Sequence, residues 1–109
     1  MADTAKVLGQ SAPLATTETD LYTVPASTSV VAGSIVIANR AATSTTFRVS
    51  VSVVGGATAN KDYLYYDISI PANDTFVATI GITLATTDKV RVYAGSANLS
   101  FNLFGIEIT

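Results

Sequence analysis

Hydrophobic and polar residues alternate with a period of two over most of the chain. In the clearest run, residues 47–53, apolar side chains occupy the odd positions and Arg48, Ser50 and Ser52 the even ones. Successive side chains of a β-strand point to opposite faces, so this run predicts a strand with one buried and one solvated face. The same spacing recurs at 64–70, 76–82 and 90–92. The pattern predicts about eight short strands and no long helix.

Turn-forming residues separate these runs at intervals of roughly 8–12 residues, which is typical of β-sandwiches and barrels. Gly55 and Gly56 close one strand, and the run 71–74 (PAND) forms a turn between two others. We therefore predict an all-β fold, an antiparallel two-sheet β-sandwich. Jelly-roll and immunoglobulin-like connectivities both give this alternation. The expected core comprises Ile35, Ile37, Phe47, Val49, Val51, Leu64, Ile68, Phe76, Ile80, Val90, Val92 and Phe101.

Two segments depart from simple alternation. Residues 34–39 (SIVIAN) are almost continuously apolar, which indicates a strand covered on both faces. Near the end of the chain, apolar residues occupy odd positions up to Leu103 and even positions from Phe104 onwards. Since alternation along a strand is strict, this change predicts a bulge or corner near Leu103 and Phe104, or burial on both faces.

Residues 1–19 alternate only weakly and end in a polar run. We predict a short strand at 6–8, followed by an extended arm that Pro13 keeps out of a helix. The Thr/Ala content offers little apolar surface against an ordering cost of about 1–2 kcal/mol per residue. We therefore expect residues 1–19 to reach a neighbouring subunit or a partner lattice, and residues 20–109 to form a single sandwich domain.

The composition limits the partners of this domain. Charged residues make up 13% of the chain, against an average of about 25%, and hydrophobic residues make up 49%. A surface with so few charges favours association with further copies or with other proteins, and the alternative is an extracellular domain with a hydroxyl-rich surface. We expect a homo-oligomer, specifically a trimer. The net charge is −2 and the six Lys and Arg residues are scattered along the sequence, so the chain has no basic patch that could bind nucleic acid. The sequence has no hydrophobic stretch long enough for a membrane span and no signal peptide, so we expect synthesis in a cytoplasm.

The residue types needed for most catalytic sites are missing. The sequence has no His and no Cys, which excludes Ser–His–Asp and Cys–His catalysis and ordinary structural zinc sites. Four carboxylates are candidates for a glycosidase pair or a calcium site: Asp62, Asp67, Asp74 and Asp88. Asp74 and Asp88 lie in turn contexts that Asp favours, and no Asp-x-Asp-x-Asp spacing occurs. We expect no enzyme activity, no cofactor and no metal.

An aromatic cluster is the candidate binding feature. Tyr63 and Tyr65 are expected on one face of a strand and Tyr66 on the other. Outward tyrosines suit sugar stacking or a protein interface, and the alternative is an aromatic ladder that supports the sheet. The residues we expect at an interface are Tyr63, Tyr65, Tyr93 and Arg91.

Six segments together resemble small virion proteins of tailed bacteriophages: 21–26 (LYTVPA), 35–40 (IVIANR), 63–67 (YLYYD), 70–76 (IPANDTF), 81–84 (GITL) and 90–94 (VRVYA). The resemblance covers roughly residues 20–108 and includes β-sandwich capsid-decoration (cement) proteins and β-sandwich tail and baseplate components. It implies no catalytic residues. It implies a structural protein on the outer surface of a capsid, assembled in the host cytoplasm and bound to the major capsid protein. The alternative is a tail, baseplate or fibre module that binds host-surface carbohydrate or other tail proteins.

Overall fold

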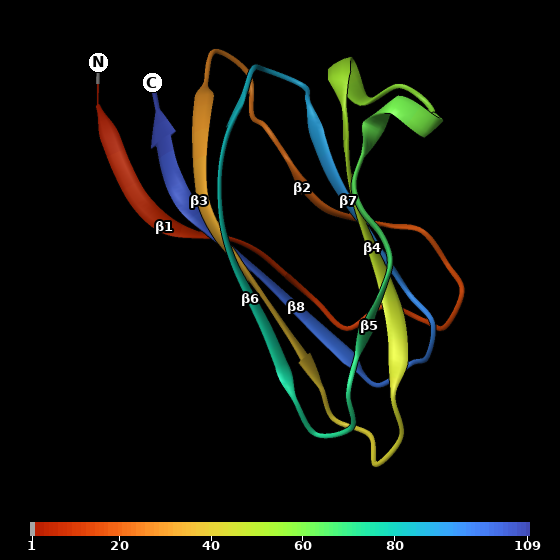
Figure 1. Ribbon diagram of the computed structural model, residues 1–109. Coiled ribbons are helices and arrows are strands. Elements are labelled where there is room, and N and C mark those ends of the chain that lie inside the picture. The colour runs from red at the N-terminus through yellow and green to blue at the C-terminus, as the bar shows by residue number, and fades with distance from the viewer. Residues whose placement is uncertain (1) are drawn as a thin grey trace.

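The computed structural model describes residues 2–109, and in this part of the chain eight strands form two antiparallel four-stranded sheets (Figure 1). Sheet A contains, in spatial order, β1 (Asp3–Ser11), β8 (Leu99–Ile108), β3 (Ser29–Asn39) and β6 (Thr75–Leu84). Sheet B contains β2 (Thr19–Thr23), β7 (Lys89–Ala94), β4 (Thr45–Ser52) and β5 (Tyr63–Ile70). The short 3-10 turns η1 (Val53–Gly55) and η2 (Asn60–Asp62) connect β4 to β5. The predicted antiparallel two-sheet β-sandwich is confirmed.

The pairing of the strands decides between the two connectivities that the sequence left open. β1 pairs with β8, β2 with β7, β3 with β6 and β4 with β5, as in one long hairpin folded at residues 53–62. Wrapping this hairpin adds the pairs β3–β8 and β4–β7, which complete the two sheets. This nested arrangement of eight strands in two sheets is a jelly roll.

The hydrophobic core lies between the sheets, around Phe47. The Phe47 ring lies 5.0 Å from that of Phe76, 6.1 Å from that of Tyr65 and 6.5 Å from that of Phe101. Most of the expected core is confirmed as buried, or as partly buried against it. Leu64 and Ile68 are the exceptions, because they are 42% and 36% exposed.

Irregularities in β5 explain why the prediction is wrong for Leu64, whereas Ile68 lies opposite Phe47 on the core-facing side and is exposed at the edge of the sheet. The register with β4 shifts on both sides of Val49, so that Leu64 is an extra residue and Tyr65 lies opposite Val49. A second extra residue, Asp67, has a positive φ of 50°. Each insertion reverses the face to which the following side chains point. Tyr65 therefore packs against the core, and Ile70 is buried further along.

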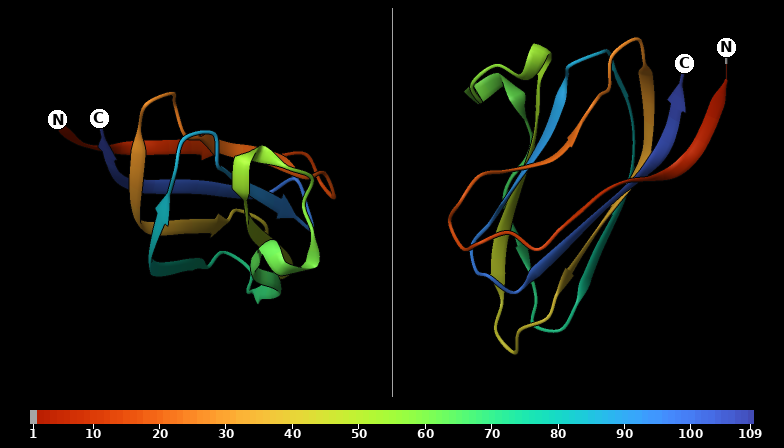
Figure 2. Two further views of the ribbon diagram at one scale, coloured as in Figure 1. Left: turned by 90° about the horizontal axis from the view of Figure 1, so that it is seen from above. Right: turned by 180° about the vertical axis from the view of Figure 1, so that it is seen from behind.

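The N-terminal segment belongs to the sandwich, which contradicts the expected extended arm. β1 pairs with β8 of the same chain from Asp3 opposite Ile108 to Ser11 opposite Phe101, and Leu8 is buried. Residues 12–18 then cross from sheet A to sheet B (Figure 2). The two chain ends lie side by side, with the Ala2 N–H donating to the Thr109 carbonyl at 2.9 Å. Backbone pairing with β8 orders this segment, although residues 1–19 contain few apolar side chains that could be buried.

Sheet A bends along a line that crosses its strands. Leu8 in β1 and Gly33 in β3 are extra residues beside Leu103 and Phe104 of β8. In β6 the same line passes through Gly81, whose φ is +54°. The change of face predicted within β8 near Leu103 and Phe104 is absent, because the extra residues lie in the neighbouring strands. β8 itself keeps its alternation, so that its even-numbered apolar residues point away from the core.

One polar contact joins the two sheets near the chain ends. The Tyr22 hydroxyl of β2 donates to Glu107 Oε2 of β8 at 2.6 Å, and Lys6 Nζ lies 3.4 Å from Glu107 Oε1. Burial is the main cause that raises the pKa of Tyr22, with the Glu107 hydrogen bond adding to it. The pKa of Glu107 is lowered, chiefly by the same hydrogen bond and further by Lys6.

Candidate interaction surfaces

The four residues expected at an interface do not form one surface. Tyr93 and Arg91 point outward from β7, next to Arg48 and Ser50 of β4. Tyr65 points inward, with its ring 5.3 Å from that of Phe76. Tyr63 instead meets Tyr66, at 4.8 Å and an interplanar angle of 80°. The prediction that Tyr63 and Tyr65 share a face is wrong, because Leu64 is an extra residue between them.

Arg48 organises an aromatic cluster on the outer face of sheet B. Its guanidinium carbon lies 4.2 Å from the ring centroid of Tyr66 and 4.4 Å from that of Tyr93. Its Nε and Nη2 donate to the two carboxylate oxygens of Asp67 at 2.7 and 3.3 Å. A guanidinium between two rings and a bidentate carboxylate is held in a fixed position. The cluster is therefore rigid, and Tyr66 within it remains exposed.

A shallow hollow lies beside this cluster. It is lined by Asn60, Tyr63 and Tyr66 and has a volume of about 270 Å³. The two tyrosine rings meet edge to face, which exposes ring surface together with an amide side chain. Aromatic surface combined with a hydrogen-bonding amide is a chemistry that can receive a sugar ring.

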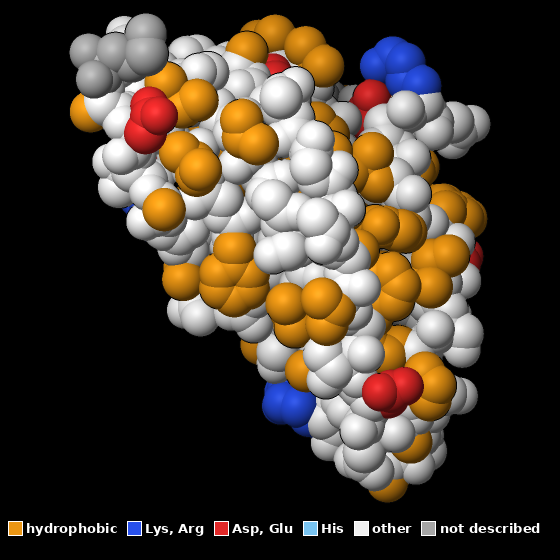
Figure 3. All heavy atoms as spheres, turned by 60° about the vertical axis from the view of Figure 1, so that its left-hand side comes forward, with side chains coloured by type: hydrophobic (Ala, Val, Ile, Leu, Met, Phe, Trp, Pro, Cys, Tyr) orange, Lys and Arg blue, Asp and Glu red, His pale blue; other side chains and the backbone are white. Residues whose placement is uncertain are grey.

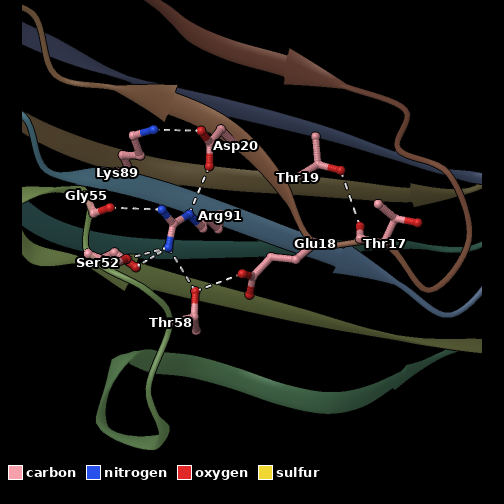
Figure 4. A network of polar contacts seen from close by, with 10 residues as sticks. Thr17, Glu18, Thr19, Asp20, Ser52, Gly55, Thr58, Lys89 and Arg91 are labelled. Atoms are coloured by element: carbon pink, nitrogen blue, oxygen red, sulfur yellow. Dashed lines mark hydrogen bonds and ion pairs between the residues drawn. The ribbon is translucent and has the colours of Figure 1, made fainter.

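Arg91 serves the fold of the neighbouring loop (Figure 4). Its Nε donates to Asp20 at 2.9 Å, and its two Nη atoms donate to the Gly55 and Gly56 carbonyls at 3.1 and 2.6 Å. Nη1 also donates to the hydroxyls of Ser52 and Thr58, each at 3.0 Å. Hydrogen bonds from Lys89 and Arg91 lower the pKa of Asp20. With every guanidinium nitrogen engaged, Arg91 holds the loop 53–62 against sheet B.

The four candidate carboxylates each have a local structural partner. Asp88 accepts the backbone N–H groups of Val54 and Ala85, each at 2.9 Å, and so supports the positive φ of 58° at Val54. Asp62 accepts the Ala59 N–H, Asp74 accepts the Thr75 N–H, and Asp67 binds Arg48. Within residues 2–109, no three acidic side chains gather in a group that could hold a metal ion.

The outer face of sheet A has a different character from that of sheet B. β3 and β6 contain no charged residue, β8 contains only Glu107, which faces Tyr22, and β1 places Asp3 on the outer face. Figure 3 shows hydrophobic side chains spread among uncharged polar ones over this side of the molecule. Strand alternation places these larger apolar side chains on this face: Val7, Val31, Val36, Val77, Phe104, Ile106 and Ile108. Val7 is 44%, Val77 63% and Ile106 39% exposed.

The sequence carries a partial signal for this face. The continuous apolar run at 34–39 indicates a strand covered on both sides, and the core covers Ile35 and Ile37. Val36 and Ala38 point the other way, where the chain supplies no second layer. In contrast, no pattern in the sequence identifies Tyr66 and Arg48 as partners, because their contact depends on the irregularities of β5.

No protein-family model matches the chain, and no curated protein matches it. Within residues 2–109, no helix has the length and apolar character needed to cross a membrane.

Proposed function

We propose that this chain is a non-catalytic structural protein of a tailed-phage virion, which decorates the capsid by binding the major capsid protein lattice through the outer face of sheet A. The observation that carries the proposal is this sparsely charged face: β3 and β6 contain no charged residue, and strand alternation places one charged side chain of β1, Asp3, on it. A soluble domain ordinarily avoids an extended face of this kind unless a partner covers it.

The size of the face suits repeated attachment. Four strands at about 4.8 Å spacing and ten residues at about 3.3 Å each give roughly 600 Å². A standard interface buries about 800 Å² on each partner. One copy is thus expected to bind weakly, and many copies on a regular lattice to bind well when they also contact each other. Jelly rolls build viral capsid proteins and also lectins, so the fold is compatible with the proposal without deciding it.

Attachment to particles tests the proposal directly. Ile106→Asp places a charge on the proposed docking face, on the inner strand β8, at a residue that is 39% exposed. Leu64→Asp is the matched control, because Leu64 is 42% exposed and lies on β5 of the other sheet. We expect Ile106→Asp to abolish binding to virions that lack the protein, and Leu64→Asp to bind normally. Equal binding of both variants would contradict the proposed face.

Copy number separates the capsid from the tail. Quantitative mass spectrometry of purified virions should give hundreds of copies per particle for a decoration protein. Single or double digits would contradict capsid decoration and support a tail, baseplate or fibre component.

The hollow at Asn60, Tyr63 and Tyr66 favours a second candidate function, a tail module that binds host-surface carbohydrate. The test is a titration of the protein with host-surface oligosaccharide, followed by NMR. Shifts should concentrate at Tyr63 and Tyr66 and disappear in Tyr66→Ala. Tyr93→Ala is the control, since Tyr93 contacts the same arginine but does not line the hollow. An absence of shifts at millimolar ligand would exclude this candidate.

A further inference from the structure

The edge strand β6 has an unusual composition for a strand at the end of a sheet. It is ten residues long, carries no charged residue and no proline, and alternates between half-buried and exposed side chains. β3 pairs with one side of β6, and the other side is the end of sheet A. An edge strand presents unpaired backbone N–H and C=O groups, which can pair with another strand. Long neutral edges are therefore normally protected.

The other three edge strands carry such protection. β1 contains Asp3 and Lys6, and it bulges at Leu8. β2 is five residues long, contains Asp20 and is irregular at Leu21. β5 contains Asp67, which both pairs with Arg48 and distorts the strand through its positive φ. In β6 the single irregularity is at Gly81, which leaves residues 75–80 regular.

We infer that β6 pairs with the β6 strand of a second copy of this chain, antiparallel across a two-fold axis. A neutral edge meets no electrostatic opposition from an identical neutral edge, whereas the same pairing of β1 or β2 would bring charged side chains into the contact. The two β6 edges also have the same length, so nearly all of the free backbone N–H and C=O groups of one edge find partners on the other. The two sheets A then become one continuous sheet of eight strands, and their sparsely charged outer faces form one surface.

The geometry of β6 restricts the register. Phe76, Ala78 and Ile80 point toward the core, so they must lie opposite core-facing residues of the second copy. Among registers with nearly complete overlap, this leaves the two-fold axis at Thr79 or at Ile80. In the first, the two Thr79 residues lie directly opposite each other, and in the second they are diagonal neighbours. Thr79 is exposed and central in both.

The area buried between the two β6 strands indicates how strong the association is. A ten-residue edge of about 33 Å and a sheet separation of about 10 Å give roughly 350 Å² per copy. This is less than half of a standard interface, so we expect a dimer that dissociates in the micromolar to submillimolar range. Because each copy has one β6, a two-fold pair is closed and does not extend into a fibre. A dimer replaces the trimer that the composition led us to expect.

Charge substitutions at Thr79 test the pairing. Sedimentation of the full chain from 10 µM to 1 mM should show a concentration-dependent species of twice the 11.3 kDa mass. Thr79→Lys and Thr79→Glu should each raise the dissociation constant at least tenfold, because like charges meet near the axis. An equimolar mixture of the two variants should restore the dimer. Ser69→Lys is the matched control, since Ser69 is exposed on β5, the edge of the other sheet on the same side, and it should leave the dimer unchanged.

Hydrogen exchange gives an independent readout. Those amides in residues 75–80 that point away from β3 should become at least tenfold more protected between 10 µM and 1 mM, and those of β1 should not. A chain that stays monomeric at 1 mM, a trimer, or a dimer unaffected by either Thr79 charge would overturn the inference. Attachment to virions is measured separately, so a failure here is distinct from a failure of the proposed capsid function.

Discussion

Removal of the Tyr22 hydroxyl tests whether the contact between the two sheets contributes to stability. In Tyr22→Phe the ring stays, so the core packing of this 9%-exposed residue is preserved. The variant loses the hydrogen bond to Glu107, whose length of 2.6 Å lies in the range of charge-assisted O–H···O⁻ bonds. The side chain of Glu107 is 15% exposed and is left with Lys6 as its partner.

The expected loss at pH 7 follows from the type of bond. Hydrogen bonds to charged groups contribute about 1.5–3 kcal/mol, and Glu107 retains some access to water, so we expect about 2 kcal/mol. For a domain of this size that loss lowers the melting temperature by roughly 10 °C. Tyr93→Phe is the control, since the Tyr93 hydroxyl makes no hydrogen bond to the described residues, and its stability should match that of the parent.

The pH dependence identifies the carboxylate. The Tyr22 hydroxyl is the main cause that holds the pKa of Glu107 below its usual value in the folded protein. A carboxyl with a lowered folded-state pKa adds stability above its unfolded pKa of about 4.3, and that stability is lost as the pH falls through the folded-state pKa. The difference between Tyr22→Phe and the parent should therefore be full at pH 7 and shrink below about pH 4.

Urea unfolding at pH 7 and pH 3, followed by circular dichroism, measures both quantities. A difference of less than about 0.5 kcal/mol at pH 7 would be no larger than that of an ordinary surface substitution and would refute the reasoning. A difference of equal size at both pH values would show that Glu107 ionisation plays no part.

Three further predictions concern the core, the first strand and the loop. Val49→Asp should lower the free energy of unfolding by about 4 kcal/mol or more, because it buries an unpaired charge. Val77→Asp, at a residue 63% exposed, should change it by less than about 0.5 kcal/mol. Similar losses for the two variants in urea unfolding would show that the faces are assigned wrongly. Deletion of residues 1–11 should abolish the native near-ultraviolet circular dichroism spectrum, because β8 loses its pairing with β1 and Leu8 is removed from the core. A native spectrum would mean that the fold does not need β1. Arg91→Lys should lower the free energy of unfolding by about 1–3 kcal/mol and speed hydrogen exchange in residues 53–62, because an ammonium cannot form the several hydrogen bonds of the guanidinium. Arg40→Lys is the control. Unchanged exchange in Arg91→Lys would show that Arg91 does not hold the loop.

The sequence by itself determined the local elements of this protein. We could predict the strand positions, the buried faces of β4 and β7 and the turn at 71–74, because these features depend on residues that are close together in the sequence. The lack of His and Cys likewise limits the chemistry of the chain whatever fold it adopts, since side chains that are absent cannot be brought together.

Only the tertiary structure decided the order of the strands and the composition of the surfaces. Jelly-roll pairing joins residues about 100 positions apart, such as Asp3 and Ile108, and β1 is ordered by that long-range pairing although its own pattern is weak. The extra residues Leu64 and Asp67 moved Tyr65 into the core and brought Tyr66 to Arg48, because one inserted residue reverses every following side chain. The neutral edge at β6 likewise became visible only when the sheet order placed that strand at an end, since exposure of a strand edge is a property of its neighbours.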